Sequence, residues 1–592
     1  MRSATGAGPG SATAGRAMPA AGRARLLSWL AMAGIGSSIL IMIASSAVRD
    51  SWMYPPIKLP GAGPPWDLTG LHMSTGVAMA ALWIALLIGA LGVIAGLGAV
   101  QRGARPSVRM ILIAAAVTVV LLTVFPPAGS TDAFDYAAYG RLVLLGHSPY
   151  VATPHLLRAT HDAIAHSVPT TWQKFHSVYG PLGTLEQFLA AKLGGTSAAR
   201  ITFWLKLWDS IAFGVVAYVA DRMLRSNPAQ RLRAHLLWTI NPLLLWDLIA
   251  AGHIDVLAAA FGLLGVLVLG QHSETARPSL LRVLAAGVLI GAAADIKANF
   301  VLFGLGLAWV LRRSLTGLVT AAAGALVVLL PSYIWFGLPA VHALSARRNG
   351  ASADSFYTQI LGSDIRPHLA EIAAVVIIAV AVLTYKRMPM GDTTRPLIRA
   401  ALVLSVAWLF FWPYQFPWYD TMIIVLLMFY PATRIDWLVI ARVAVGSLPN
   451  TPGNPTNPPG HVLDLLHHWS IVAIAPLVLL AAALGLIVLC VTRQWTPRVP
   501  GGPPGSAPEE PELVPSAANL FEAPSAANSS EAPSAANSSE ATSAASSEAT
   551  SAANLSAAAL RLRRPRPGLS PRSRPGLGRE AGQDRSPAAR SR

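Results

Sequence analysis

Long apolar runs separated by short polar and basic connections dominate the pattern of this chain. The first run, Leu26 to Ala47, is long enough to cross a bilayer, which takes about 20 apolar residues. Several other runs are shorter, especially the paired runs within 281–311 and 420–448. The pattern predicts an all-α, polytopic integral membrane protein with about 12–14 transmembrane helices. The apolar runs cover residues 26–47, 72–99, 110–126, 200–221, 234–250, 254–270, 281–295, 298–311, 314–335, 369–385, 397–413, 420–431, 435–448 and 469–491.

Composition supports the membrane assignment. Hydrophobic residues make up 53% of the 592 residues and charged residues only 12%, about half the charged share of soluble domains. The net charge of +17 is spread between the apolar runs and the C-terminal tail, without the interleaved aromatic residues that would favour nucleic acid as a partner. The single cysteine, Cys490, lies in an apolar run, which excludes a disulfide framework and a thiolate metal site.

The basic residues between apolar runs predict the orientation of the chain. Loops rich in Lys and Arg alternate with loops that are poor in them, and basic loops stay on the cytoplasmic side of a membrane. This alternation places the 127–199 loop and the 336–368 loop on the outer side. We therefore expect a multi-pass plasma-membrane protein with a long first extracytoplasmic loop. The basic loops contain Arg102, Arg105, Arg109, Arg222, Arg225, Arg231, Arg233, Arg312, Arg313, Lys386, Arg387 and Arg493.

The two ends of the chain differ from its middle. Residues 1–25 are small, polar and arginine-bearing, which predicts a cytoplasmic N-terminal tail before an uncleaved membrane anchor. Residues 26–491 then form the multi-span catalytic domain. Residues 492–592 are rich in Ala, Ser and Pro and carry near-repeats such as EAPSAANSS. Such a sequence buries too little apolar area to offset its ordering entropy, so a disordered cytoplasmic tail is expected.

Two carboxylates, Asp132 and Asp135, open the first long stretch of mixed polar sequence, Ser130 to Tyr150. They directly follow an apolar run and share one face if the stretch begins as a helix. Glycosyl transfer needs a carboxylate that takes the proton from an attacking hydroxyl. For a lipid-linked donor, that carboxylate must stand at the lipid–water boundary. The alternative interpretation is a pair of solvated helix-capping residues.

Several short motifs, taken in order, resemble those of membrane glycosyltransferases that use polyprenyl-phosphate sugars. In particular, the chain resembles the actinobacterial polyprenol-phosphomannose-dependent α-1,6-mannosyltransferases, which belong to the GT-C superfamily. The resemblance covers residues 110–430. It rests on D-x-x-D-Y at Asp132, GHSPY at Gly146–Tyr150, YGPL at Tyr179–Leu182, Asn241-Pro242 with Trp246, GHID at Gly252–Asp255, Lys297 in ADIKANF, and Pro417–Tyr419 in PYQFPWYD.

This resemblance implies a GT-C-type fold and a defined reaction. Mannose would move, with inversion, from polyprenyl-phosphate-mannose to an α-1,6-mannan acceptor of the lipomannan or lipoarabinomannan type. The resemblance also implies that Asp132 or Asp135 is the catalytic base and that Lys297 binds the donor phosphate. The implied substrate-binding residues are Tyr150, His253, Asp255, Trp418 and Tyr419.

Three arginines are further candidates for the donor phosphate. Arg141 follows the two aspartates, and Arg347 and Arg348 lie on the second outer loop. For each, an ordinary surface or headgroup contact is the alternative.

The implied roles of the other candidates have structural alternatives as well. Lys297 stands two positions after Asp295 and could pair with it. His253 and Asp255 could form a hydrogen-bonded turn between two short helices. Trp418 and Tyr419 could belong to an aromatic belt at the membrane interface.

Cofactors and partners follow from what the motifs contain. The sequence has no P-loop, Rossmann glycine pattern or H-E-x-x-H motif, so a lipid-linked donor fits better than a nucleotide sugar. Such a donor carries one phosphate, and its chemistry does not require a divalent metal; we expect no cofactor and no metal site, with a divalent metal on the outer carboxylates as the alternative. The expected partners are the donor lipid, a membrane-anchored mannan and the bilayer. The alternatives are a transporter or flippase of polyprenyl-linked intermediates and a GT-C transferase of another sugar.

Overall fold

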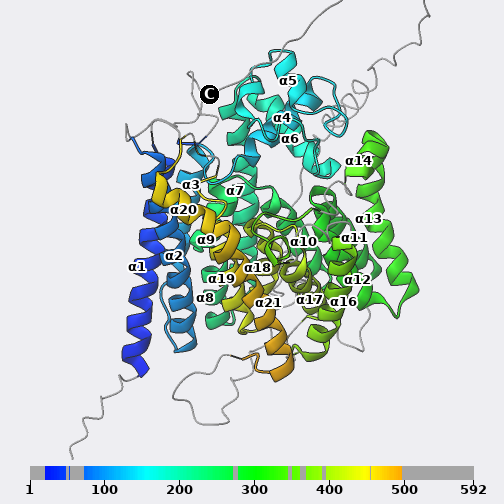
Figure 1. The fold of residues 1–592 in the computed structure, drawn as a ribbon. Helices are drawn as coiled ribbons and strands as arrows, with labels where there is room; N and C mark the ends of the chain where they lie inside the picture. The colour runs from blue at the N-terminus through cyan, green and yellow to red at the C-terminus, as the bar shows by residue number, and fades with distance from the viewer. Residues whose placement is uncertain are drawn as a thin grey trace, which may run out of the picture. The chain divides into compact units, whose positions relative to one another are not determined.

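A computed structural model describes residues 20–48, 52–53, 72–270, 278–343, 350–360, 368–389, 395–453, 455 and 457–496. Contacts divide the chain into two units, Met1–Ala523 and Pro524–Arg592, and every described residue belongs to the first. Apart from one bridge between Met53 and Pro455, the regular structure of the described residues is helical (Figure 1). The predicted all-α, polytopic membrane fold is confirmed. The tail expected after residue 496 lies outside the described residues.

Each predicted apolar run overlaps one or more helices. The long 127–199 loop also contains helices, α4 to α6. The helices are α1 (Ala20–Ser46), α2 (Thr75–Gln101), α3 (Val108–Val124), α4 (Asp132–Leu144), α5 (His155–Ala159), α6 (Pro181–Gly194), α7 (Ala198–Met223), α8 (Pro228–Leu237), α9 (Pro242–Leu244), α10 (Asp255–Val268), α11 (Leu280–Ile296), α12 (Val301–Leu311), α13 (Leu315–Phe336), α14 (Leu338–Ala343), α15 (Phe356–Ile360), α16 (Leu369–Arg387), α17 (Pro396–Phe411), α18 (Thr421–Leu427), α19 (Ile435–Ser447), α20 (His461–Trp469) and α21 (Ala475–Thr492).

Six helices in the described part of the chain are long and apolar enough to cross a membrane. A bent pair, Pro228–Ala250 with Asp255–Val268, would make a seventh span. Further apolar helices, α3, α12, α17 and Pro417–Leu427, are shorter. Because length and composition do not decide whether the shorter helices cross, the expected number of 12–14 spans stays a prediction. The six are α1, α2, α7, α13, α16 and the continuous stretch His461–Thr492.

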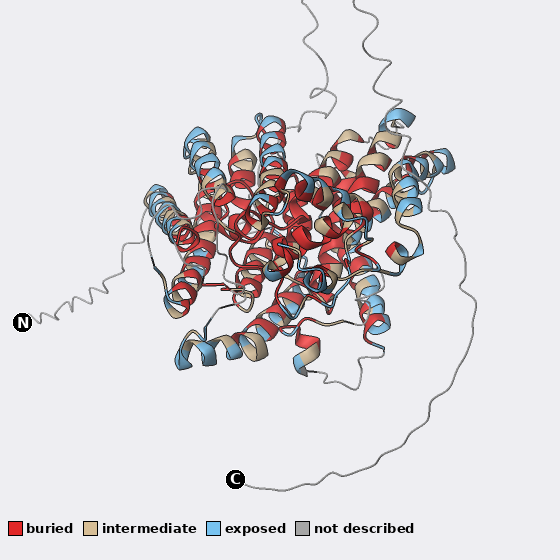
Figure 2. Ribbon diagram, turned by 90° about the horizontal axis from the view of Figure 1, so that it is seen from above, coloured by how far each residue is buried: buried red, intermediate tan, exposed pale blue. Residues whose placement is uncertain are grey.

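The outer helices expose apolar side chains. On α13, Leu315, Ile334 and Trp335 are 77%, 71% and 82% exposed. Buried residues gather on the inner helices, and the exposed faces belong to the helices at the edge (Figure 2). A helix that is apolar on its outward face suits a hydrocarbon solvent.

The bent span brings polar residues into the interior of the protein. The chain bends by 117° between Pro228–Ala250 and α10. Gly252 lies in the break with φ +73°, and a Cβ there would stand 3.0 Å from Cγ of Lys206. Glycine meets both conditions, since it adopts positive φ freely and has no Cβ. His253 and the first residue of α10, Asp255, therefore lie at the break.

A buried lysine on α7 holds the end of α3. The Lys206 ammonium donates hydrogen bonds to the carbonyl oxygens of Leu122 at 2.6 Å and Phe125 at 2.8 Å. The last carbonyls of a helix have no partners within the helix. Lys206 satisfies two of them and so fixes the point from which the 127–199 segment departs.

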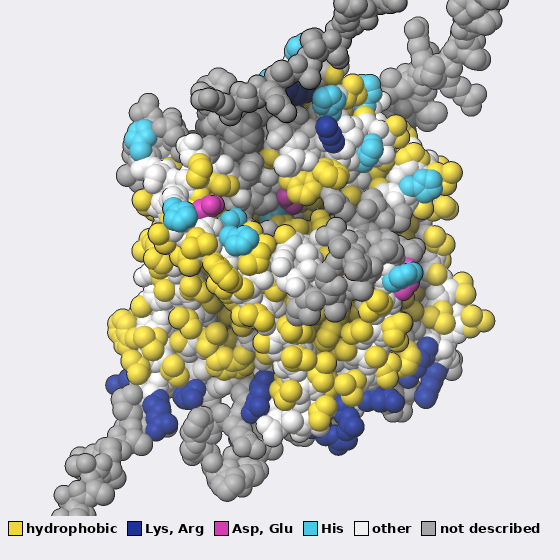
Figure 3. Space-filling view, in the orientation of Figure 1, with side chains coloured by type: hydrophobic (Ala, Val, Ile, Leu, Met, Phe, Trp, Pro, Cys, Tyr) yellow, Lys and Arg dark blue, Asp and Glu magenta, His cyan; other side chains and the backbone are white. Residues whose placement is uncertain are grey.

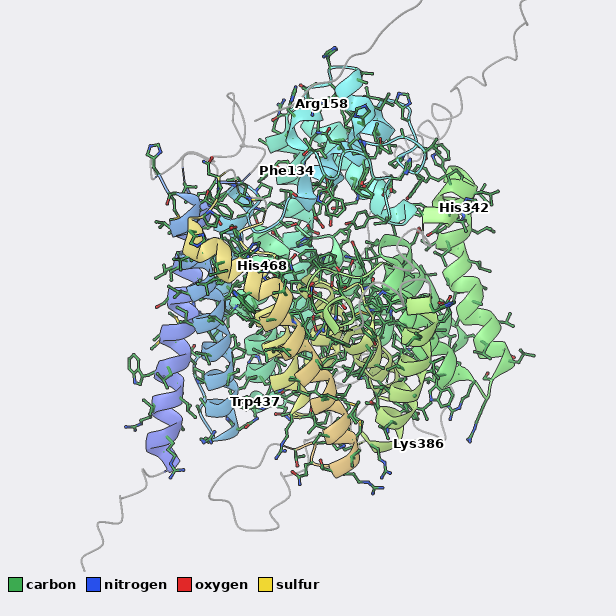
Figure 4. The ribbon with its side chains drawn as sticks, in the orientation of Figure 1. Phe134, Arg158, His342, Lys386, Trp437 and His468 are labelled. Carbon is green, nitrogen blue, oxygen red and sulfur yellow. The ribbon has the colours of Figure 1, made fainter. Side chains whose placement is uncertain are left out.

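Basic side chains gather at one end of the helices. In Figure 3, Lys and Arg lie along the lower edge, below a belt of hydrophobic side chains. Figure 4 labels Lys386 at that edge and Arg158 and His342 at the opposite one. The helices α4, α5 and α6 lie at the upper end (Figure 1). This separation agrees with the orientation expected from the basic loops.

A labelling experiment tests the orientation. Thr160 lies after α5 and Ser226 in the turn between α7 and α8, and both are exposed. We expect a membrane-impermeant maleimide to modify a Thr160→Cys variant in intact cells, and Ser226→Cys only after permeabilisation. Background labelling should be low, because Cys490 is buried. The opposite labelling pattern would reverse the orientation.

Candidate functional site

A cavity of about 300 Å³ opens beside the start of α4. Its acidic lining residues are Asp132 and Asp135. Many of the others are aromatic, and such a mixture of a few polar groups with aromatic faces is typical of small-molecule sites. The aromatic residues are Tyr139, Trp172, Phe175, Tyr179, Tyr414, Phe416, Trp418 and Tyr419.

The two aspartates lie in the first turn of α4. The Asp132 backbone N–H donates to the Ser130 hydroxyl at 3.2 Å, while the N-cap residue, Thr131, makes no side-chain capping bond. Carboxylates in a first turn are favoured by the helix dipole. The alternative of two solvated capping residues is wrong, because neither aspartate is the N-cap residue and Asp135 is buried.

His253 links the broken span to Asp132. Its Nε2 lies 3.5 Å from the Asp132 carboxylate, whose side chain is 23% exposed. On the other side of the ring, Nδ1 donates a hydrogen bond to the backbone carbonyl of Asp247. This bond orients the imidazole, so that Nε2 faces the carboxylate. The histidine is therefore more than part of a turn, because it contacts a residue far away in sequence.

An aromatic stack covers His253. The Trp418 ring stacks on the imidazole with centroids 3.9 Å apart, and Phe416 stacks on Trp418 at 4.8 Å. A buried ion pair, Arg442 Nε to Asp420 Oδ1 at 2.9 Å, anchors the turn Pro417–Asp420 to α19. Trp418 thus forms part of the cavity wall as well as the cover of the histidine.

Lys297 lies behind the cavity wall. Its ammonium is 2.5 Å from Oδ2 of Asp255 and 4.2 Å from the centroid of the Tyr419 ring, with the Tyr179 ring at 5.9 Å. The alternative pairing with Asp295 is not present, because Asp295 accepts a hydrogen bond from Ser332 instead. The lysine side chain remains 11% exposed.

The two cavity aspartates differ in their electrostatics. Burial alone would raise the pKa of Asp132, but the hydrogen bond and charge of His253, together with the charge of Lys297, lower it overall. Burial and the neighbouring charge of Asp132 raise the pKa of Asp135 well above its ordinary value. The two carboxyl groups are thus shifted in opposite directions, Asp132 toward the ionised form and Asp135 toward the protonated form.

The motif Tyr179–Leu182 holds residues 127–199, the predicted outer segment, against the end of α11. The Gly180 N–H donates to the carbonyl of Ile296 at 3.3 Å, and the Tyr179 hydroxyl donates to that of Tyr136 at 3.1 Å. A Cβ on Gly180 would lie only 1.8 Å from the Asp295 carbonyl oxygen. The close approach requires glycine and sets Tyr179 beside Lys297.

Some predicted residues are not brought to the cavity. Arg141 forms an ion pair with Asp162 at 2.9 Å and does not line the cavity. The Tyr150 hydroxyl bonds to Thr184 and to the Tyr179 carbonyl, so its contacts support the motif. Arg347 and Arg348 lie outside the described residues.

Three functional neighbours were missing from the sequence-based site. Arg442 and Asp420 were detectable, since ionisable residues in apolar runs are functional candidates by default. Lys206 was detectable for the same reason, because it is an ionisable residue inside a long apolar helix. Among the described residues, no group of three or more His, Cys, Asp or Glu side chains could hold a metal ion. The expectation that no metal is needed stays a prediction.

The fold and cavity define a polytopic membrane protein whose acidic, aromatic-lined site lies near one end of its helices. Residues 31–313 match the N-terminal domain of the α-(1→6)-mannopyranosyltransferase family. The matched range contains Asp132, His253 and Lys297 but ends before Trp418.

Two curated relatives align with parts of the chain. A probable α-(1→6)-mannopyranosyltransferase of Mycolicibacterium smegmatis is 28% identical over 165 residues, which cover 28% of this chain and 29% of the relative. An α-(1→6)-mannopyranosyltransferase of Mycobacterium tuberculosis is 26% identical over 145 residues, which cover 24% of each protein. The chain thus spans under a third of either relative in these alignments. No solved structure matches.

The close approach at Gly180 yields a stability prediction. Gly180→Ala should lower the thermal unfolding midpoint in detergent, because the new methyl group displaces the Asp295 carbonyl at a cost of about 1–3 kcal/mol. Gly214→Ala on α7 is the matched control, since a Cβ there meets nothing within 4 Å. The control should be neutral or stabilised by about 0.5–1 kcal/mol. Equal midpoints for both variants would contradict the close packing.

Proposed function

We propose that this chain is a membrane mannosyltransferase. It moves mannose from polyprenyl-phosphate-mannose to an α-1,6-mannan acceptor of the lipomannan type, in one inverting displacement. The match of residues 31–313 to the α-(1→6)-mannopyranosyltransferase family supports the mannosyl transfer. The observation that carries the catalytic part is the position of Asp132 at the cavity, beside His253 and Asp135, with its pKa lowered while that of Asp135 is raised.

Asp132 is the general base in this proposal. An acceptor hydroxyl in the cavity attacks the anomeric carbon of the donor mannose, and the new C–O bond forms as the bond to the phosphate oxygen breaks. Asp132 takes the hydroxyl proton, which only an ionised carboxylate can do. Asp135, in its neutral form, donates a hydrogen bond to the acceptor sugar. Attack from the face opposite the phosphate converts a β-linked donor into an α-linked product.

Lys297 receives the departing phosphate. An ammonium group has three N–H donors, and Asp255 takes one of them. The remaining donors and the positive charge stabilise the negative charge that develops on the leaving lipid phosphate. Asp255 acts as the residue that positions Lys297. Because Tyr419 covers the ammonium, donor binding moves this ring or approaches beside it.

The aromatic wall suits a sugar acceptor. Trp172 and Phe175 come from the outer segment, and Phe416 and Trp418 face the cavity from the segment after α17. Flat aromatic faces bury the apolar C–H surface of a pyranose at a low cost in side-chain entropy. Helix α4, which carries the two aspartates, lies at the upper end in Figure 1, and in the same orientation Lys and Arg gather along the lower edge in Figure 3, which supports an extracytoplasmic position in the plasma membrane. The partners are the donor lipid, the membrane-anchored mannan and the bilayer.

A transporter or flippase of polyprenyl-linked intermediates is the second candidate. The observation that favours it is the broken span with its ion pair between Lys297 and Asp255, since discontinuous helices with internal charges form the substrate sites of many transporters. The two functions differ in their need for a base. A transporter moves its lipid without removing a proton from Asp132.

Substitution of the base tests the proposal. Membranes containing the protein would be given radiolabelled polyprenyl-phosphate-mannose and a short α-1,6-mannoside. Asp132→Asn should reduce transfer by about 100- to 10,000-fold, because the amide cannot accept the proton. Asp135→Asn should have a smaller effect, since the amide still donates a hydrogen bond. Protein abundance and donor binding should persist in both variants.

Asp162→Asn is the matched control. Asp162 belongs to the same outer segment but pairs with Arg141 and does not line the cavity, so transfer should stay close to normal. Normal turnover by Asp132→Asn would remove it as the base. Lipid translocation without mannose transfer in the unmodified protein would favour the transporter.

A further inference from the structure

A second hollow lies on the side of the helices, between α6, α7 and α10. It has a volume of about 410 Å³, and twelve of its thirteen lining residues are hydrophobic. The exception is Glu186, whose two carboxylate oxygens are buried without hydrogen-bond partners. Burial without a partner favours the neutral, protonated form of a carboxyl group. The hollow is thus an apolar groove along its whole length.

One end of this groove touches the proposed phosphate site. Ile296, which directly precedes Lys297, lines the groove. Leu257, on α10 just after Asp255, lines it as well, and so does Leu182 from the motif that supports Tyr179. The ammonium and the apolar lining are therefore joined through neighbouring residues of the same backbone segments.

The groove runs from there along two long helices. Its lining includes Trp208 to Val215 on α7 and Leu257 to Leu264 on α10. Seven residues of helix correspond to about 10 Å at 1.5 Å per residue. The groove is therefore an elongated feature that follows the helices away from Lys297.

The groove is open to the side and has a floor of small residues. Leu185, Leu189 and Ile211 are 46%, 41% and 56% exposed along it. Ala212 and Ala260 are each only 5% exposed and line its inner part. A larger side chain at either alanine would fill space that is now empty. Such a lateral opening lets a hydrocarbon chain enter from the bilayer.

We propose that this groove binds the isoprenoid chain of the donor lipid, with the units nearest the phosphate beside Ile296. This inference rests on the proposed function, because it assumes that the phosphate lies at Lys297. The complementarity has two parts: a cation for the single phosphate and a continuous apolar groove for the single chain attached to it. Burying the chain there contributes about 25 cal/mol per Å² of apolar surface and holds the phosphate beside the cavity.

Photo-crosslinking of the full-length protein in lipid nanodiscs tests this proposal. The probe is a polyprenyl phosphate with a diazirine on an isoprene unit near the phosphate. Crosslinks should map to α6, Trp208–Val215 and Leu257–Leu264. Excess unlabelled polyprenyl phosphate should suppress them, whereas excess phosphatidylglycerol should not. Crosslinks on α13 or α16, or equal suppression by both lipids, would show that the groove holds bilayer lipid only and would overturn the proposal.

Groove-filling variants provide an independent measurement. Ala212→Leu and Ala260→Leu should each reduce crosslinking severalfold. Ala217→Leu is the matched control, because Ala217 lies on α7 with 6% exposure but does not line the groove. Thermal unfolding would identify a variant that fails to fold. In that case, the crosslinks formed by the unmodified protein still locate the binding site of the chain. Undiminished crosslinking in both folded variants would contradict the assignment.

Crosslinking requires no turnover, so the two proposals can fail separately. Labelling of the groove in a protein that transfers no mannose would leave the chain-binding site standing and reject the transferase. Mannose transfer with crosslinks outside the groove would reject the chain-binding site and leave the transferase proposal standing.

Discussion

The need to partner buried polar groups organises this structure. The span that contains Gly252 breaks and bends, and it leaves His253 and Asp255 buried in the protein interior. A buried ionisable group without a partner is costly. Each therefore pairs with a group from another segment: His253 with Asp132, and Asp255 with Lys297. These two pairings bring the outer segment and the end of α11 to the same point.

The pairings also divide the charges in a useful way. The neighbouring His253 and Lys297 lower the pKa of Asp132, whereas burial and the charge of Asp132 raise the pKa of Asp135. One carboxyl is thereby prepared to accept a proton and the other to donate a hydrogen bond. The same lysine that helps to ionise the proposed base is the proposed partner of the leaving phosphate. In the proposed reaction, one cluster of charged groups thus serves both the removal of the acceptor proton and the departure of the phosphate.

Close backbone approaches keep these groups in place. Gly180 sets the outer segment against α11, and Lys206 fixes the point where that segment leaves α3. Both contacts are made away from the cavity, yet both determine where Asp132 and Tyr179 lie. The apolar groove begins on the same framework, beside Ile296. Lys297 lies behind the wall of the cavity that contains Asp132, and its chain neighbour Ile296 lines the groove, an arrangement that suits the proposed substrate with its polar head and apolar tail.

The sequence by itself determined the all-α membrane fold, because apolar runs must lie in hydrocarbon and their backbone bonds close locally within helices. It also identified Asp132, His253, Asp255 and Lys297 as candidates, because the short motifs that contain them resemble those of a known family of membrane glycosyltransferases. Only the tertiary structure decided the pairings, which join residues distant in sequence. Local pattern could not show that Arg141 pairs with Asp162 or that the pKa of Asp132 is lowered while that of Asp135 is raised. Those outcomes depend on burial and on the distances between segments, which packing alone sets.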